Sequence, residues 1–347
     1  MAATVAPFDP AGASDADLEA LYRVVIELER EELPDDPPKP LAAFVAELRH
    51  PLRYRRGWYY VARPGASDSI IGYAHLYVDD VGDNEHLAYL EGGVLLDERR
   101  QGVARALLAP VVAKANEIGR RLLMAYAPEG HEAAETFFRL LGGDRRYIER
   151  RSRLRIDDVD RVRMKEWIEQ ASERAFGYEV VGWTGPCPDE LVEPYTQLLH
   201  VMNTAPTEAL DFDDEVFTPD RLRAEEERLA VLGWEWSTLV ARQLATGELA
   251  GLTELSFPAA QEWLAYQGNT GVDPLHRNKG LGRWLKAAMI GQTVLERSEL
   301  RAVDTWNANS NDPMLNINVA MGFKPVGYLG GWQTPVDAAA SALEAKR

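Results

Sequence analysis

One sequence pattern occurs twice in this chain, and it constrains the possible fold more than any other feature. The copies span residues 94–108 and 272–286, and each reads Val, four residues, Arg, two residues, Gly, one residue, then Gly or Ala. The two arginines, Arg99 and Arg277, lie 178 positions apart, which is too long for a solenoid repeat and typical of a whole domain. We therefore expect the 347 residues to form two copies of one domain.

The segments around each copy repeat the same order of expected elements. Apolar residues at helical spacing predict a helix over 15–33 and another over about 102–118 in the first half. Strand-like runs lie at 58–62, 70–78, 87–96, 122–127 and 146–156, and a short helix is expected at 132–141. The second half repeats this order, with its motif helix over about 280–297.

This order predicts the α/β (α+β) class, with two tandem domains, each a mixed and mostly antiparallel sheet flanked by helices. The expected boundaries are an N-terminal domain over 1–156 and a C-terminal domain over 177–336. Between them lies a charge-rich linker over 157–176, for which a connecting helix is one interpretation. Residues 337–347 are expected to be a frayed, Ala-rich tail.

Composition excludes several classes of protein. The net charge of −17 argues against a nucleic-acid partner, because polyanion binding needs clustered Lys and Arg. We find neither a signal peptide nor an apolar run of membrane-spanning length, so we expect no membrane partner. The single cysteine, Cys187, allows no disulfide within the chain and no cysteine metal cluster. These features predict a cytoplasmic protein without a metal site, either a monomer or a homodimer.

The repeated motif has the chemistry of an anion site. It follows a strand and opens a helix, where free backbone N–H groups and the helix dipole favour a negative charge. Glycine lets a phosphate approach the backbone, and Arg277 with Lys279, or Arg99 with Arg100, adds positive charge. A helix start with a turn glycine is the alternative interpretation. The dinucleotide fingerprint fits less well, and the nucleotide-hydrolase phosphate loop is absent.

The motif resembles the acetyl-CoA pyrophosphate motif of the GNAT superfamily of N-acetyltransferases, and the chain as a whole is similar to actinobacterial tandem members. Residues 305–323 also resemble the second motif of that family. The resemblance implies acetyl-CoA as the cofactor, with Val272 and Val94 offering backbone groups to the pantetheine arm and Asn311 bonding it. It implies a pyrophosphate cradle from Asn278, Lys279, Gly280, Leu281 and Gly282, beside Arg277, and from Arg99, Arg100, Gln101, Gly102, Val103 and Ala104 in the first copy.

The resemblance also implies direct attack of the acceptor amine on the thioester, which needs a base and an acid. Glu254 is the base candidate of the second half and Glu91 that of the first; each could instead be a solvent-facing strand carboxylate. Asn318 occupies the position of the family's acidic Tyr in the second half and Phe138 in the first, and neither donates a proton as Tyr does. Tyr328 is a further acid candidate, or a packed strand residue. The C-terminal half keeps the better cofactor signature and is expected to be catalytic, while the more degenerate N-terminal half could bind acetyl-CoA poorly or serve as a scaffold.

An acidic stretch marks the expected acceptor side of the second domain. Asp211, Asp213 and Asp214 form either a solvated acidic loop or a lip that draws in a cationic amine. Arg151, Arg153 and Arg155 share one strand face and are expected to meet solvent, or else a CoA phosphate. The favoured hypothesis is an N-acetyltransferase for a small, cationic amine. A non-catalytic acyl-CoA sensor, and an enzyme that acetylates a protein N-terminus or lysine, are the alternatives.

Overall fold

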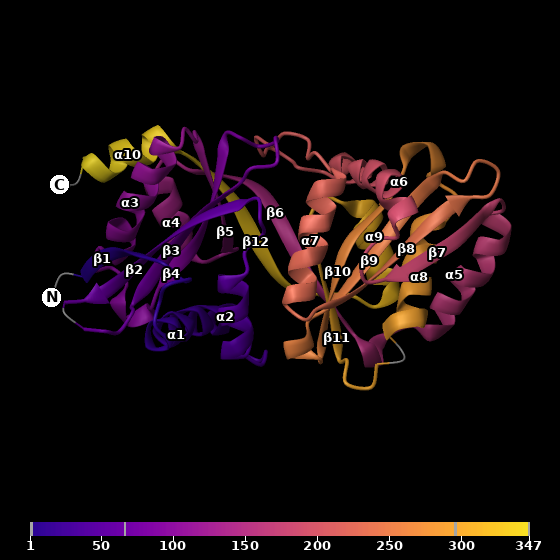
Figure 1. The fold of residues 1–347 in the computed structure, drawn as a ribbon, viewed down its shortest axis with the longest axis horizontal. Helices are drawn as coiled ribbons and strands as arrows, with labels where there is room; N and C mark the ends of the chain where they lie inside the picture. The colour runs from indigo at the N-terminus through magenta and orange to yellow at the C-terminus, as the bar shows by residue number, and fades with distance from the viewer. Residues whose placement is uncertain (1–2, 66, 295–296, 346–347) are drawn as a thin grey trace. The chain divides into compact units, whose positions relative to one another are not determined.

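The computed structural model describes residues 3–65, 67–294 and 297–345, and they form two compact units. Unit 1 contains the described residues up to Ile148, the segment Glu208–Asp213 and the described residues from Leu329 onward. Unit 2 contains Glu149–Thr207 and Asp214–Tyr328. Both units have the expected mixed α/β architecture (Figure 1). They differ from the expected boundaries, because each unit includes segments from both halves of the chain.

Unit 1 is a mixed sheet with helices on both faces. Its strands follow the order β1-β2-β3-β4-β5-β12, then the first part of β6. Neighbouring strands from β1 to β4 are antiparallel, and α3 is the crossover to the parallel strand β5. The elements are β1 (Ala3–Phe8), α1 (Asp15–Glu32), α2 (Leu41–Arg49), β2 (Arg55–Pro64), β3 (Gly72–Asp79), β4 (Leu87–Val94), α3 (Val103–Glu117), β5 (Leu122–Pro128), α4 (Glu132–Leu140), β6 (Asp144–Arg155), β12 (Lys324–Pro335) and α10 (Val336–Glu344).

Unit 2 repeats this plan. Its strands follow the order β7-β8-β9-β10-β11, then the end of β6 and the start of β12. Here β10 and β11 form the parallel pair, with α8 as the crossover between them. The elements are α5 (Arg161–Arg174), β7 (Tyr178–Thr184), α6 (Asp189–Leu199), α7 (Pro219–Val231), β8 (Glu235–Gln243), β9 (Leu249–Phe257), β10 (Leu264–Val272), α8 (Leu281–Met289), β11 (Ala302–Ala308) and α9 (Asp312–Met321).

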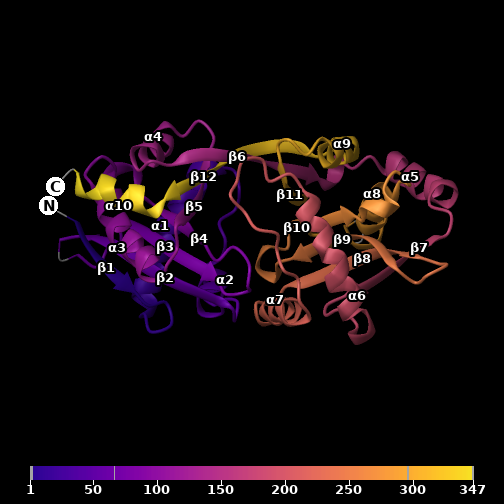
Figure 2. The same ribbon diagram turned by 90° about the horizontal axis from the view of Figure 1, so that it is seen from above.

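Two long strands serve both units. The end of β6 pairs with β11 in unit 2, and the end of β12 pairs with β5 in unit 1. Each strand is followed by a helix that packs on the crossover helix of the unit it enters, α5 on α8 and α10 on α3. Figure 2 shows α10 beside α3. Each sheet is thus completed by a strand from the other half of the chain.

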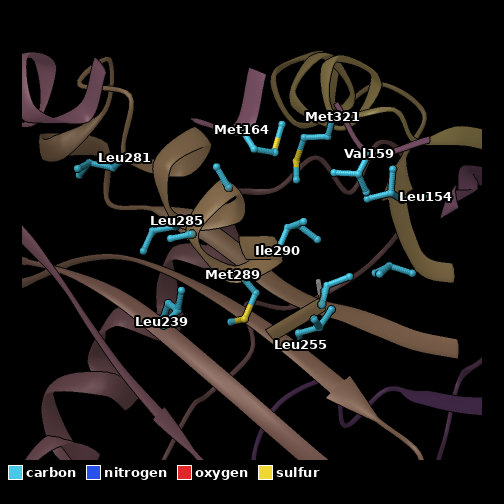
Figure 3. Packing of buried hydrophobic residues seen from close by; sticks show 14 of the residues in the cluster. Leu154, Val159, Met164, Leu239, Leu255, Leu281, Leu285, Met289, Ile290 and Met321 are labelled. Atoms are coloured by element: carbon cyan, nitrogen blue, oxygen red, sulfur yellow. The ribbon is translucent and has the colours of Figure 1, made fainter. Parts of the chain in front are cut away.

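The frayed tail expected over 337–347 instead contains most of α10 (Val336–Glu344); residues 346–347 lie outside the described residues. Val336 and Ala339 are buried against the core of unit 1, and this burial holds the helix in place. Residues 161–174 of the expected linker likewise form α5, whose Met164 is buried with Leu285 and Met321 in the core of unit 2 (Figure 3). The motif helix expected over about 280–297 is α-helical only as far as Met289, because residues 290–294 form a π-helical turn. Residues 295–296 of the expected helix lie outside the described residues.

Two further observations bear on partners. Within residues 3–65, 67–294 and 297–345, no helix combines the length and apolar character needed to cross a membrane. Over the same ranges, no three His, Cys, Asp or Glu side chains are grouped as metal ligands.

Candidate functional site

Two parallel strands of unit 1 separate part-way along their length. Strands β4 and β5 pair only over Leu87–Tyr89 and Leu122–Met124. Beyond this point β4 carries Gly92 at a φ of 141°, where a Cβ would lie 2.2 Å from the carbonyl oxygen of Tyr73, so no larger residue fits. The separation leaves backbone groups of β4 and β5 without partners in each other, and such groups can bind an extended ligand.

A cavity of about 550 Å³ opens at this separation. Its walls come from the ends of β4 and β5, the facing sides of α3 and α4, and α10. Most of its lining side chains are apolar, among them Leu107, Leu108 and Phe137, and α10 contributes Ala342 and Leu343. Arg105 of α3 donates hydrogen bonds to the carbonyl oxygens of Ala342 and Leu343, which fixes α10 as part of the wall.

The repeated motif lies at one end of the cavity. Arg100 and Gly102 have left-handed backbone conformations, with φ values of 64° and 83°, and Gly102 is the N-cap of α3. No side chain caps this helix, so the amides of its first turn, which include those of Val103 and Ala104, have no side-chain partner. A Cβ on Gly102 would meet no atom within 4 Å, so the space before the helix is open. This arrangement can hold a phosphate.

Arg99 fixes the shape of the loop rather than presenting a free charge. Its Nε donates to the carbonyl oxygen of Val94 at 2.8 Å, and its Nη2 donates to Glu31 of α1 at 2.7 Å. Gln101 donates to the carbonyl oxygen of Asp97 at 3.1 Å. The first arginine of the motif therefore ties the loop back to the strand that precedes it.

Glu91 is the carboxylate at the mouth of this cavity. Its side chain is 60% exposed, and His75 Nδ1 lies 3.6 Å from its Oε2. Partial loss of water around the carboxylate raises its pKa, but hydrogen bonds from His75 and Tyr77 and the charges of His75 and Arg55 lower it further, so the net pKa lies below the usual value. Glu91 therefore remains ionised over the neutral pH range and can accept a proton.

Two phenols line the cavity on the same sheet face as Glu91. Tyr73 lies on β3, two residues before the cross-strand partner of Glu91, and Tyr126 lies on β5, two residues beyond the partner of Tyr89. Tyr126 is 45% exposed. Phe138, which occupies the position expected for an acidic Tyr, stacks on Trp332 at 5.4 Å. A proton donor on this side of the cavity would come from β3 or β5 rather than from α4.

Unit 2 repeats the backbone geometry. Strands β10 and β11 pair only over Leu264–Tyr266 and Ala302–Asp304. Asn278 and Gly280 have φ values of 65° and 81°, matching Arg100 and Gly102, and Leu281 and Gly282 open α8. The two motif loops therefore have the same conformation.

The side chains around the second loop form their own hydrogen bonds. Arg277 donates to the carbonyl oxygen of Val272 at 3.0 Å and to Thr204 Oγ1 at 2.6 Å, as Arg99 does to Val94 and Glu31. Lys279 Nζ donates to Tyr178 Oη at 2.7 Å, so its charge is held over that ring. Asn311 caps α9 through its Oδ1, which accepts from the amide of Met314 at 3.3 Å.

The base candidate of unit 2, Glu254, is partly buried and Asn318 is fully buried, whereas Tyr328 is 40% exposed. Glu254 accepts a short hydrogen bond from Tyr195 Oη and one from the amide of Asn269 at 3.0 Å. Burial raises the pKa of Glu254 above its usual value, although these hydrogen bonds lower it. Asn318 is 1% exposed; its Nδ2 donates to Asn307 at 2.8 Å, and its Oδ1 has no partner.

Comparison with known proteins agrees with this geometry. The sequence model of the acetyltransferase (GNAT) family matches residues 19–142, and no curated protein was found to match the chain. A solved tandem GNAT protein from the clavulanic acid biosynthesis pathway has a TM-score of 0.78 at 25% identity, over 96% of this chain and 99% of that one. Residues 19–142 thus match the GNAT family model, and the chain as a whole resembles a solved tandem GNAT protein.

Two other solved structures share the fold of this chain. A GCN5-related N-acetyltransferase from Sphaerobacter thermophilus has a TM-score of 0.68 at 14% identity, over 96% of both chains. A GCN5-related glucosamine N-acetyltransferase region of a fungal multi-domain β-N-acetylglucosaminidase has a TM-score of 0.67 at 15% identity. It matches 95% of this chain and 38% of that one.

The acidic residues expected to line the acceptor side of the second domain fall in different units. Asp211 and Asp213 belong to unit 1, and Asp214 to unit 2. His86 Nε2 lies 3.2 Å from Asp211, its Nδ1 lies 3.4 Å from Asp213, and Phe212 between them contacts the edge of Tyr89 at 6.4 Å. These contacts hold a loop from the second half of the chain against unit 1, near the strand that carries Glu91.

The expectation that the arginines of β6 face solvent is wrong for two of them. Arg151 and Arg153 both donate to Asp304 of β11, which is fully buried, at 2.5–2.9 Å. A buried carboxylate requires such partners, because an unpaired charge there is costly. The alternating arginines of the sequence gave no indication of Asp304, which lies about 150 positions away.

Several residues around the two motif loops were not identified from the sequence. His75, Tyr77 and Tyr126 meet Glu91 or the cavity only because strands β3, β4 and β5 are neighbours, and Tyr195 meets Glu254 only through the packing of α6 on β9. Their one sequence signal is the alternation of Tyr73, His75 and Tyr77, which places three polar aromatic residues on one face of a strand.

Proposed function

We propose that this protein transfers the acetyl group of acetyl-CoA to the amine of a small, cationic acceptor, and that the cavity of unit 1 is the reaction site. The observation that carries the proposal is the coincidence of three features: the separation of β4 and β5, the 550 Å³ cavity at that separation, and the uncapped, open N-terminus of α3. Together they offer free backbone groups, an apolar slot and an anion cradle in one continuous site.

The residues present fit acetyl-CoA. The open space before Gly102 and the left-handed Arg100 and Gly102 suit a pyrophosphate on the first amides of α3. The apolar walls of α3 and α4 suit the pantetheine arm, which would also meet backbone groups of Val94 and its neighbours. When bound, acetyl-CoA supplies an activated thioester. In unit 2 the corresponding residues, from Arg277 to Gly282 with Val272 and Asn311, are proposed as a second cradle.

Glu91 supports catalysis in unit 1 rather than in the C-terminal half favoured by the sequence. It is an exposed, ionised carboxylate at the mouth of the cavity, so it can take the proton of the acceptor ammonium and free the lone pair. Glu254, by contrast, is partly buried and accepts hydrogen bonds from Tyr195 and from the amide of Asn269. Tyr126, across the strand separation from Glu91, is placed to donate a proton to a leaving thiolate.

The acidic loop of Asp211, Asp213 and Asp214 supports a cationic acceptor. Two of its carboxylates lie in unit 1, and Phe212 between them contacts Tyr89 on the strand that leads to Glu91. Negative charge beside a cleft raises the local concentration of cations. We propose that Asp211 and Asp213 draw the amine toward Glu91.

Replacement of Glu91 tests the proposal. In a thiol-release assay against a panel of amines, Glu91→Gln should lower kcat by about 100-fold, the size expected for loss of a general base. Acetyl-CoA affinity should stay unchanged, because Glu91 makes no part of the cradle. Glu85→Gln, which changes an exposed carboxylate of the same unit, is the matched control.

A non-catalytic acyl-CoA-binding protein is the second candidate, and Phe138 favours it. The aromatic residue stacked on Trp332 stands where the family resemblance places an acidic Tyr. Tight acetyl-CoA binding in calorimetry, without thiol release on any amine, would support this alternative and contradict acetyl transfer.

A further inference from the structure

The surroundings of Glu91 suggest a second residue that controls its chemistry. His75 pairs with Glu91 across β3 and β4, and its Nδ1 faces the carboxylate at 3.6 Å. The imidazole is 8% exposed, whereas the carboxylate that it faces is largely exposed. A buried ring thus reaches toward a carboxylate at the cavity mouth.

Packing fixes the orientation of this imidazole. Tyr59 stacks on it with ring centroids 3.8 Å apart and planes 6° apart, and Tyr77 lies 5.1 Å away on its own strand. On the Nε2 side the ring lies against Gly57, where an added Cβ would stand 2.7 Å from Nε2. Because Nε2 is enclosed by Gly57, Nδ1 is the nitrogen left to serve Glu91.

We propose that His75 is a positioning residue, which holds the Glu91 carboxylate ionised and aimed at the mouth of the unit 1 cavity. The catalytic role of His75 rests on the proposed function, whereas its pairing with Glu91 is observed independently of that function. An oriented donor restricts the carboxylate to one rotamer, and a proton acceptor works only when it is held within hydrogen-bond reach of its proton. The direction of the Glu91 pKa, below its usual value, agrees with this pairing.

Unit 2 differs at the same two positions. Gly72 and Gly251 have matching surroundings, each facing a carbonyl of the next strand, the motif valine and a leucine of the crossover helix. Counting from these glycines and from Val94 and Val272, Glu254 occupies the position of His75, and Asn269 that of Glu91. The imidazole–carboxylate pair therefore belongs to unit 1.

Other ionisable groups near the pair are already engaged. Arg55 forms a two-pronged ion pair with Asp79 and lies 4.1 Å from the centre of the Tyr77 ring, and Glu31 of α1 is paired with Arg99. Tyr89 stacks on Tyr77 at 5.0 Å. The charged or titratable groups that surround Glu91 from β2, β3, α1 and the motif loop are Arg55, Asp79, His75, Glu31 and Arg99. The phenols around it are those of Tyr59, Tyr73, Tyr77 and Tyr89.

The test measures the pKa of Glu91 directly, by ¹³C NMR titration of labelled glutamate carboxyls, with the signal assigned by its loss in Glu91→Gln. His75→Phe keeps a ring to stack on Tyr59 and removes the nitrogen, so the pKa of Glu91 should rise toward its usual value. His75→Asn keeps a donor near the Nδ1 position and should restore part of the shift. An unchanged Glu91 pKa in a folded His75→Phe protein overturns the proposal.

Kinetics give a second measurement where an acceptor amine is turned over. His75→Phe should lower kcat about tenfold or more, without changing KM for acetyl-CoA, and should move the acidic limb of the kcat/KM profile to higher pH. Combined with Glu91→Gln it should cause no further loss, because the two residues act as one unit. An equal, additive loss in the double variant contradicts the proposal.

Two further variants keep the experiment decisive. If His75→Phe fails to fold, His75→Leu removes the same nitrogen without introducing a ring and should raise the Glu91 pKa in the same direction. His200→Phe, at an imidazole of unit 2 that contacts Phe217, is the matched control and should change neither quantity. Absence of turnover with every amine would contradict the proposed acetyl transfer, yet the NMR titration would still decide the role of His75.

Discussion

Lys286 shows how much the identity of one residue matters where two copies of a domain share a backbone. It takes the position of Leu108, a wall residue of the unit 1 cavity, yet it is 1% exposed and its Nζ donates to Gln267 at 3.1 Å. Burial lowers the pKa of this amine to about 7. A charged or polar group at this position makes the interior of unit 2 chemically different from the apolar slot of unit 1.

This burial predicts a pH-dependent stability. The folded pKa of Lys286 is about 7, against 10.5 for an exposed lysine, so the unfolded chain binds more protons between these values. Stability contributed at this site should therefore rise as the pH increases from 7 to 10.5. Relative to the wild type, Lys286→Met should raise the free energy of unfolding at pH 6 by about 2–5 kcal/mol, at 1.36 kcal/mol per pKa unit, and by much less at pH 10.

Urea denaturation at pH 6, 8 and 10 measures this difference. Lys165→Met, at an exposed lysine of α5, is the control for removal of a lysine charge. If Lys286→Met raised the free energy of unfolding equally at pH 6 and pH 10, the pKa of Lys286 would be the same in the folded and unfolded states, and the prediction would be wrong.

The start of a helix is the element on which cofactor binding depends in both units. α3 and α8 begin at Gly102 and Gly280, with φ values of 83° and 81°, and neither has a side-chain cap. A carboxylate introduced here would repel a phosphate and would strain a left-handed backbone.

Gly102→Glu should therefore remove acetyl-CoA binding to unit 1, with a rise in Kd of about 100-fold or more. Gly280→Glu should abolish CoA binding in unit 2 and leave unit 1 intact. Titration calorimetry separates the two effects through the number of sites. Gly82→Glu, at another left-handed glycine with no atom within 4 Å of an added Cβ, controls for backbone strain. Undiminished affinity and stoichiometry in Gly102→Glu would exclude the cradle.

Helices and strands with a clear apolar period could be predicted well from the sequence. The expected helix over 15–33 appears as Asp15–Glu32, and the strand over 122–127 as Leu122–Pro128, because their apolar residues follow the helical and strand periods. β1 and α2 escaped prediction, since short segments carry too few residues to display a period. Glu91 was found by its place relative to the motif, but His75 was not, because cross-strand neighbours are fixed by the register of the sheet.

For the whole molecule, the sequence repeat predicted two domains but not which segments of the chain each domain contains. Strands β6 and β12 each serve both units, and the loop of Asp211 and Asp213 lies on unit 1, although it follows the expected boundary. Such exchange depends on long-range pairing, which has no local sequence signal.

The position of this loop predicts an electrostatic effect on acceptor binding. Replacing Asp211, Asp213 and Asp214 together by Asn should raise KM for a cationic acceptor several-fold at low ionic strength, and the difference should shrink as salt is added. Asp214→Asn alone changes a carboxylate of unit 2 and should have the smaller effect. The same KM in the triple variant and the wild type would mean that the loop does not attract the amine.

The exchanged strands have a consequence for how such a protein can change over generations. Both the first strand, Ala3–Phe8, and the last helix, Val336–Glu344, belong to unit 1, so unit 2 is inserted within the chain of its neighbour. A deletion from the C-terminal end therefore removes α10 and most of β12, which belong to unit 1, before it reaches unit 2. Truncation from that end thus disrupts unit 1 before it removes the body of unit 2.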